Sequence, residues 1–309
     1  MLHLEKYHPN HKSKWDAFVS ESKNGVFLFY REYLEYHQER FVDHSLIFLK
    51  KNKIIALFPA NQSGMEIFSH AGLTFGSLLI GNAIKASEVM ALFGLLKAYY
   101  QNLGFTKITY KAIPSIYHRY PADEDLYALF INKATLVRRD LASVIQLENK
   151  IGFSQTKKQS VTKCIQNQIT ITQNNDLEEY WDLLTNVLSK FGVKPVHSYK
   201  EITHLKALFP DKIQLYEARK NNVLLAGIVI YDYKQVVHTQ YMANSEEGRK
   251  IGALNYINAH LISQVYQHRK YYSLGTSMQD HGLLNEGLIQ QKELMGSRAI
   301  AIDFYELIL

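Results

Sequence analysis

The sequence predicts a mixed α/β (α+β) protein made of two tandem domains, each with a mixed central sheet flanked by helices. Its 309 residues exceed the usual size of a single hydrophobic core, so two domains of about 150 residues are expected. Short alternating apolar runs, typical of strands, are interspersed with longer segments of helical periodicity. The same order of elements occurs twice. We therefore place an N-terminal domain at residues 1–150 and a C-terminal domain at residues 151–309.

The first half is expected to contain two helices, then a three-strand meander, then alternating helices and strands. Helices are predicted at residues 13–22, 31–37, 84–102 and 123–134, and strands at residues 44–50, 54–60, 65–70, 105–112 and 135–147. The turn KKNK joins the first two strands of the meander, and its Asn52 suits the positive φ of a tight hairpin.

The second half repeats this order after a polar helical linker, FSQTKKQSVTKCIQNQ. Strands are predicted at residues 168–172, 213–218, 224–233, 236–244, 271–276 and 299–309, and helices at residues 176–191, 198–209, 250–268 and 285–296. The segment DHSLIFLKKNKIIALFPA begins at Asp43, and the similar segment DKIQLYEARKNNVLLAGIVI begins at Asp211. Duplication of one domain is the simplest explanation.

Composition narrows the class of partner. A formal net charge of +6 suits an anionic ligand such as a nucleotide, coenzyme A or RNA. Lysine and arginine are dispersed, without a block of five or more, so no nucleic-acid partner is expected. Cys164 is the single cysteine, which favours a structural role and no metal site. No segment reaches the roughly 18 to 20 apolar residues that span a bilayer, so we expect a cytoplasmic protein without membrane insertion.

The segment VVHTQYMANSEEGRKIGALNYINAHLI predicts a strand that runs through a polar, glycine-containing turn into a helix. The first amides of such a helix lack partners and carry partial positive charge, so they can bind a pyrophosphate. Gly248 and Gly252 would let a diphosphate approach the main chain, unless they serve only the start of the helix. The candidate binding residues are Met242, Asn244, Gly248, Arg249, Lys250, Gly252 and Ala253.

The next helix carries Asn285, Leu288, Lys292 and Gly296, a spacing that resembles the last helix of GNAT-type (Gcn5-related) acetyltransferases. The resemblance implies that coenzyme A lies where two parallel strands diverge, here HTQYMAN and YYSLGT. It also implies that a main-chain amide near Met242 to Asn244 polarises the thioester carbonyl. Asn285 and Lys292 are added to the coenzyme A site. Lys292 stands where the family commonly has a tyrosine that protonates the thiolate, so it could act as the acid or bind a phosphate.

The whole chain resembles the FemAB-like branch of this superfamily, in which two such domains are fused. The matching pieces are SLGTS at residues 273–277, Gly287, Gln291, Met295 and the strand RRDLASV at residues 138–144. The resemblance implies a large nucleotide-linked acceptor and a first domain without a working coenzyme site. The sequence agrees with that, since the predicted strand MEIFSH leads into AGLTFGSLLIG, not into a charged glycine turn opening a helix.

Polar and aromatic residues of the first half are instead candidates for binding the acceptor. They fall at predicted strand ends and loops, where ligands are commonly held, and rings can stack on a base while cations meet a diphosphate. Ordinary polar loops would give the same pattern. The candidates are His70, Thr74, Phe75, Lys111, Tyr117, His118, Arg119 and Tyr127, with Gln240 and Tyr241 from the second half.

This loop pattern, with PVHS at residues 195–198 and HTQYMAN at residues 238–244, is similar to two-domain N-acyltransferases of O-antigen and capsule sugar pathways. The resemblance implies transfer of an acyl group, such as 3-hydroxybutanoyl, from its coenzyme A ester to the amine of a dTDP-linked amino-deoxy sugar. The attacking amine must be neutral, so a base is needed nearby. The candidates are Asp280, His281, His238 and His197.

Two alternatives remain open. Other FemAB-like proteins transfer an aminoacyl group from charged tRNA to a peptidoglycan precursor, commonly with an additional helical arm that this sequence lacks. A non-catalytic protein that binds a nucleotide sugar is the other alternative, and Lys292 in place of tyrosine is its best support.

Overall fold

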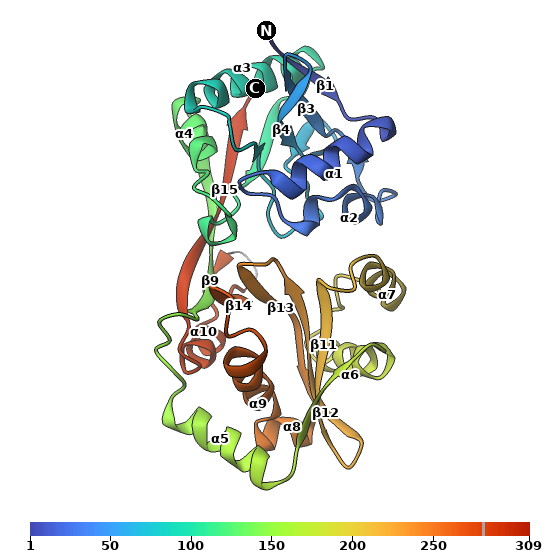
Figure 1. Ribbon diagram of the computed structural model, residues 1–309, viewed down its shortest axis with the longest axis vertical. Coiled ribbons are helices and arrows are strands. Elements are labelled where there is room, and N and C mark those ends of the chain that lie inside the picture. The colour runs from blue at the N-terminus through green and yellow to red at the C-terminus, as the bar shows by residue number, and fades with distance from the viewer. Residues whose placement is uncertain (280–281) are drawn as a thin grey trace. The chain divides into compact units, whose positions relative to one another are not determined.

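The computed structural model describes residues 1–279 and 282–309, and these divide into two compact units (Figure 1). Unit 1 comprises Met1–Asp140 and Ala301–Leu309, and unit 2 comprises Leu141–Ile300. Two long strands, β9 (Thr135–Gln146) and β15 (Arg298–Ile308), pass from one unit into the other. The C-terminal strand therefore completes the sheet of unit 1. None of the helices among the described residues is long and apolar enough to cross a membrane.

Unit 1 contains two sheets. Their strand orders are β1-β3-β4-β7 and β15-β8-β6-β5-β2. The other elements of this unit are β1 (Leu2–Lys6), η1 (Pro9–His11), α1 (Lys12–Glu21), η2 (Phe27–Phe29), α2 (Arg31–Glu35), β2 (Val42–Asp43), β3 (Leu46–Lys50), β4 (Lys53–Phe58), β5 (Asn61–Ser63), β6 (Glu66–Phe68), β7 (Leu79–Ile80), α3 (Ala86–Asn102), β8 (Lys107–Lys111), η3 (Ser115–Tyr117) and α4 (Glu124–Ile131). Helix α3 buries Leu92, Phe93 and Leu96 against strands that include β3 and β4.

The predicted meander of the first half is only partly correct. Strands β3 and β4 form the expected hairpin, and Asn52 has a φ of 60° at its turn. The third predicted strand, β6, pairs with β5 and with β8 and not with β4. Pro59 follows β4 directly and cannot donate a ladder hydrogen bond, so the chain leaves the first sheet there. The short strands β1, β2, β5 and β7 were not predicted.

Unit 2 has one sheet, in the order β10-β11-β12-β13-β14-β9, in which only β13 and β14 are parallel neighbours. Its elements are α5 (Gln155–Gln166), β10 (Thr170–Asn174), α6 (Glu178–Ser189), α7 (Tyr199–Leu208), β11 (Ile213–Lys220), β12 (Val223–Asp232), β13 (Val236–Asn244), α8 (Glu246–Ile251), α9 (Ala253–His260), the π-helix η4 (Leu261–Val265), β14 (Tyr271–Thr276) and α10 (Glu286–Glu293). Helices α6 and α7 lie on one face of the sheet, and α9 lies on the other (Figure 1).

The single helix predicted at residues 250–268 is wrong. The chain forms α8, then α9, then η4, and the break between α8 and α9 falls at Gly252, whose φ is +85°. This left-handed conformation ends a helix readily at glycine because there is no Cβ to clash. The start of α9 is therefore a separate helix terminus in the middle of the predicted one.

Candidate functional site

Strands β13 and β14 pair over only three positions before they part. The parallel register joins Val236 with Tyr271 and ends at His238 and Ser273. Two residues further along β14, Gly275 has a φ of +73°. Beyond His238 the ladder between β13 and β14 ends, although β13 continues to Asn244.

A β-bulge at Gln240 decides which face of the sheet each later residue of β13 occupies. Val229 of β12 pairs with Tyr241 and Ile230 pairs with Thr239, which leaves Gln240 as the extra residue. Tyr241 packs against Trp181 of α6. Met242, the next residue, pairs with Ile228 and packs into the core beneath α9.

His238 precedes the bulge and lies on the α6 face. It pairs with Tyr231 of β12, which lies on the same face as Val229 because side chains alternate along a strand. The divergence of β13 and β14 is thus bordered by His238 on one face and by Met242 and Asn244 on the other.

A cavity of about 320 Å³ lies on the α9 face at this divergence. It is lined by Lys157, Met242, Asn244, Arg249, Gly252, Leu254, Asn255, Asn258, Leu288, Gln291, Lys292 and Met295. Met242, Asn244, Arg249, Gly252 and Lys292 were predicted from the sequence to bind coenzyme A. The remaining polar side chains, from Lys157, Asn255, Asn258 and Gln291, were not.

The lining of this cavity is cationic. Its ionisable side chains are Lys157, Arg249 and Lys292, and no carboxylate is among the lining residues. The side-chain oxygen of Asn244 is buried and has no hydrogen-bond partner among the described residues. Three cations without a compensating acid create a positive potential that favours an anion.

Lys292 reaches from α10 to the end of β14. Its side chain is almost completely buried, and Nζ donates to the main-chain oxygens of Gly275, at 3.1 Å, and Thr276, at 2.6 Å. Burial lowers the pKa of Lys292 to about 8. An ammonium group with that pKa can give up a proton near neutral pH.

His238 is held by Ser273 across the paired part of the two strands. Its Nδ1 lies 3.1 Å from Oγ of Ser273. Burial, together with the charge of Lys292, lowers the pKa of His238 to about 4. The imidazole is therefore neutral at physiological pH.

The anion site predicted near Arg249 falls on helix α8, whose start already has a side-chain cap. Ser245 caps this helix by accepting a hydrogen bond from the Gly248 amide, and two glutamates occupy its first turn. A Cβ on Gly248 would lie 2.1 Å from the Leu225 oxygen, so this glycine allows close packing on β12. Residues at the start of α9, namely Gly252, Leu254 and Asn255, line the cavity.

The other residues predicted to bind coenzyme A are Lys250, Ala253 and Asn285, and their surroundings are as follows. Lys250 is exposed, and its main-chain oxygen accepts a hydrogen bond from Lys163. Ala253 is fully buried in the core of unit 2. Asn285 caps α10 by accepting a hydrogen bond from the Leu288 amide at 3.0 Å.

Of the other predicted bases, the structure describes His197, which contacts Tyr241 of β13. His197 lies in the loop before α7, where its Nδ1 is 2.6 Å from the hydroxyl of Tyr241. Burial raises the pKa of Tyr241 to about 12, so this phenol stays protonated. Asp280 and His281 lie outside the described residues.

In unit 1, the predicted acceptor residues divide into buried and exposed groups. Phe75 and Tyr117 are buried in ring contact with each other. Thr74 and Tyr127 are exposed. Arg119 donates to the main-chain oxygen of Ser22.

Three other predicted acceptor residues of unit 1, Lys111, His70 and His118, are buried. Lys111 donates through Nζ to the oxygens of Ala71, at 3.1 Å, and Leu73. Burial lowers the pKa of Lys111 to about 8 and that of His70 to about 3. Nε2 of His118 lies 3.2 Å from the Ile113 oxygen. These contacts stabilise the loops that carry the three side chains.

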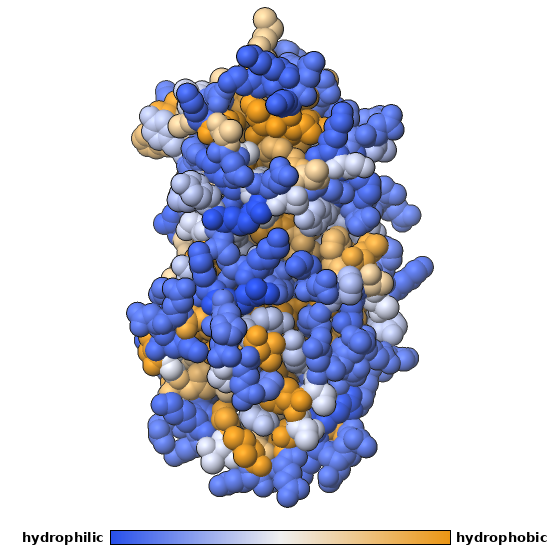
Figure 2. All heavy atoms as spheres, in the orientation of Figure 1, coloured by the Kyte–Doolittle hydropathy of each residue, from blue (hydrophilic) through white to orange (hydrophobic). Residues whose placement is uncertain are grey.

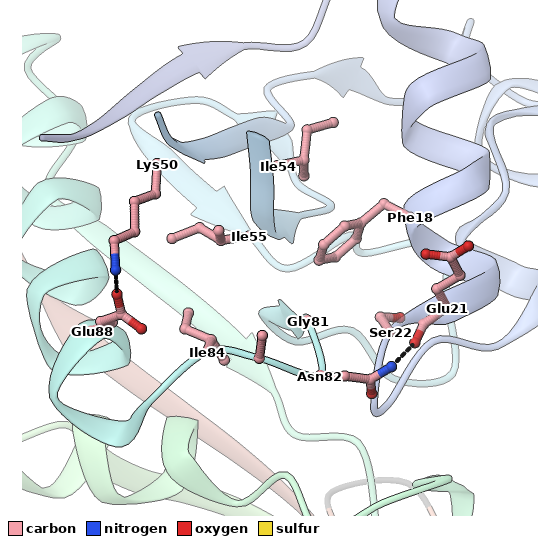
Figure 3. A pocket seen from close by; sticks show the side chains of 11 residues that line it. Phe18, Glu21, Ser22, Lys50, Ile54, Ile55, Gly81, Asn82, Ile84 and Glu88 are labelled. Carbon is pink, nitrogen blue, oxygen red and sulfur yellow. Dashed lines mark hydrogen bonds and ion pairs between the residues drawn. The ribbon is translucent and has the colours of Figure 1, made fainter. Parts of the chain in front are cut away.

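Unit 1 has a cavity of its own, of about 350 Å³, in which Lys50 and Glu88 form an ion pair (Figure 3). It is lined by Phe18, Glu21, Ser22, Lys50, Ile54, Ile55, Gly81, Asn82, Ala83, Ile84 and Glu88. Apolar side chains reach the surface around β3 and β4, as Figure 2 shows. With two carboxylates and one lysine, this cavity does not suit a polyphosphate.

Comparison with solved structures identifies the fold. FemX is similar to this chain with a TM-score of 0.71 at 11% sequence identity, covering 99% of this chain and 97% of FemX. L-PGS from Bacillus licheniformis has a TM-score of 0.61 at 12% identity, covering 98% and 92%. A tandem GNAT protein from the clavulanic acid biosynthesis pathway has a TM-score of 0.54 at 8% identity, covering 100% and 98%.

The sequence itself matches no protein-family model and no curated protein. The similarity to these solved structures shows that the chain has a FemAB-like tandem GNAT fold, as predicted. At these identities the likeness concerns the fold, and function has to be argued from the site.

Proposed function

We propose that the protein is an N-acyltransferase that moves an acyl group from acyl-CoA to the amine of an acceptor. The observation that carries this proposal is the cationic cavity at the divergence of β13 and β14. A donor with a pyrophosphate and a thioester needs positive charge at one end and main-chain donors at the other. Lys157, Arg249 and Lys292 in the cavity lining support the first of these requirements.

The cavity residues have distinct parts in holding the donor. Arg249 and the amides at the start of α9 would bind phosphate groups. The amides of β13 near Met242 would donate hydrogen bonds to the carbonyl oxygen of the thioester as negative charge develops on it. Acyl-CoA supplies the activated carbonyl and the thiolate leaving group.

His238 and Lys292 can handle the two protons of this transfer. As the amine nitrogen bonds to the carbonyl carbon, it becomes strongly acidic, and neutral His238 can accept its proton directly or through water. When the carbon–sulfur bond breaks, Lys292 can give its proton to the departing thiolate. The products are an amide and a free thiol.

A nucleotide-linked amino sugar, of the dTDP type, is the acceptor that we propose. Its support is the resemblance to sugar N-acyltransferases and the polar side chains of unit 1, of which Tyr127 and Thr74 are exposed. The burial of Phe75 and Tyr117 removes them from this proposal as stacking partners.

The proposal is tested by incubating the protein with acetyl-CoA or 3-hydroxybutanoyl-CoA and a panel of dTDP- and UDP-amino sugars. Release of free thiol, with a product heavier by one acyl group in mass spectrometry, is the expected result. Thiol release that does not depend on the amine would indicate hydrolysis only. No release with any donor and amine would overturn the proposal.

Aminoacyl transfer from charged tRNA is the second candidate, because FemX shares the fold over nearly the whole chain and a cationic cavity also suits the phosphates of RNA. Mass spectrometry of ligands that co-purify with the protein separates the two donors. Coenzyme A species support the first candidate and tRNA supports the second.

A further inference from the structure

Helix α5, the linker between the two repeats, packs against the start of α9 and contributes Lys157 to the lining of the cationic cavity. A Cβ on Gly252 would lie 2.6 Å from Cβ of Ser160, so the missing side chain lets α5 approach the start of α9. Further along α5, Sγ of Cys164 lies 3.4 Å from the Ile251 oxygen, and Lys163 donates to the Lys250 oxygen. These contacts satisfy the last carbonyl groups of α8.

This packing places Lys157 in the wall of the cavity. Its Nζ donates to Oδ1 of Asn255 at 3.1 Å, and Nδ2 of Asn255 donates to Oγ of Ser160 at 3.0 Å. Asn255 is thus oriented with its acceptor toward the lysine.

Lys157 has no acidic partner within the part of the chain that the structure describes. Its side chain is partly buried, and burial lowers its pKa. Holding an ammonium group with only a neutral amide for a partner costs free energy that a bound anion would recover. Arg249 lines the same cavity from α8, so two cations from different helices face one space.

We propose that Lys157 binds a phosphate group of the donor, so that the linker helix α5 belongs to the donor site. This inference rests on the proposed function, since it concerns the same cavity. It adds an anion-binding residue that lies outside residues 236–262, the segment in which the sequence predicted the pyrophosphate site.

The test uses the full-length protein with Lys157→Gln, Lys157→Arg and the matched control Lys158→Gln. Lys158 is the next residue of the same helix and is exposed. Binding of coenzyme A and of inorganic pyrophosphate is measured by calorimetry, and circular dichroism melts check that each variant is folded.

We expect Lys157→Gln to weaken binding of both probes by about 10-fold or more, as for the loss of a hydrogen bond to a charged group. Lys157→Arg should retain most of the affinity, and Lys158→Gln should bind as the wild type does. If a folded Lys157→Gln variant bound each probe with the same affinity as the wild type, the inference would be overturned and the proposed function would stand.

Failure of the proposed function gives a different result. Pyrophosphate binding that depends on Lys157, without any binding of coenzyme A, would support the anion site and contradict the acyl-CoA donor. Absence of binding of either probe to the wild type would overturn both proposals.

Discussion

Nζ of Lys292 lies 2.6 Å from the main-chain oxygen of Thr276, so the side chain from α10 is fixed at the end of β14. The two carbonyl oxygens that it contacts hold the ammonium group beside the point where β13 and β14 part. The ammonium group of Lys292 thus offers a proton donor at the end of β14.

Replacing Lys292 should change the alkaline limb of the pH profile. A general acid works in its protonated form, and the pKa of Lys292 is about 8, so kcat of the wild type should fall as the pH rises through about 8. Lys292→Met should lower kcat by about 100-fold or more at pH 7. Thiol release measured from pH 6 to pH 10 checks this.

Lys292→Tyr provides the comparison, because a tyrosine has an ordinary pKa near 10. Its alkaline limb should move to higher pH while part of the activity returns. If the alkaline limb of Lys292→Tyr lay at the same pH as that of the wild type, a group other than Lys292 would be responsible for it.

Replacing His238 should lower the rate of the reaction. Titration of this histidine should produce no acidic limb in the pH profile near neutral pH. The pKa of His238 is about 4, so the neutral form prevails at pH 5 and above, and any fall of kcat/KM between pH 7 and pH 5 should follow protonation of the acceptor amine and persist in His238→Gln. His238→Gln should lower kcat by about 100-fold with little effect on coenzyme A affinity.

Ser273→Ala tests the positioning of the imidazole, since Oγ of Ser273 is its partner at 3.1 Å. A loss smaller than that of His238→Gln, mainly in kcat, is expected. Full activity of His238→Gln would exclude this histidine as the base.

The sequence allowed prediction of the strands and most helices around the site, because their periodicity and turn residues are local. Met242 and Lys292 could be named as candidates because they lie on a recognisable strand and a recognisable helix. Lys157 could not, since its place depends on how Ser160 of a linker helix packs against Gly252, which only the tertiary structure sets. The bulge at Gln240 determines which face of the sheet each later residue of β13 occupies. It could not be predicted from the alternation of apolar and polar residues in this strand.

The same packing makes Gly252 sensitive to substitution. Gly252→Ala would place a Cβ at a positive φ and against Ser160, where the nearest atom would be 2.6 Å away. We expect a loss of about 2 to 4 kcal/mol in the free energy of unfolding of unit 2. Urea denaturation measures it.

Gly192→Ala is the matched control. Gly192 also has a positive φ, of +71°, but nothing lies within 4 Å of the position that an added Cβ would take. It should cost only the backbone strain, about 1 kcal/mol. Equal losses for the two variants would mean that contact with α5 contributes nothing, whereas Ser160→Gly should partly rescue Gly252→Ala.

A buried acid in unit 1 should make stability depend on pH. The hydroxyl of Tyr110 donates to Oδ2 of Asp125, and burial raises the pKa of Asp125 to about 7. Between about pH 4 and pH 7 the folded state holds a proton that the unfolded state releases. Stability should therefore fall as the pH rises through this window, by up to about 4 kcal/mol, and then level off.

Asp125→Asn removes this titration while keeping a polar group of similar shape. The difference in the free energy of unfolding between variant and wild type should move in favour of the variant as the pH rises from 5 to 7.5. Other groups titrate equally in both proteins, so the comparison isolates Asp125. A difference that is constant with pH would show that the carboxyl group is ionised throughout, with its charge stabilised by the Leu126 amide that donates to Oδ1.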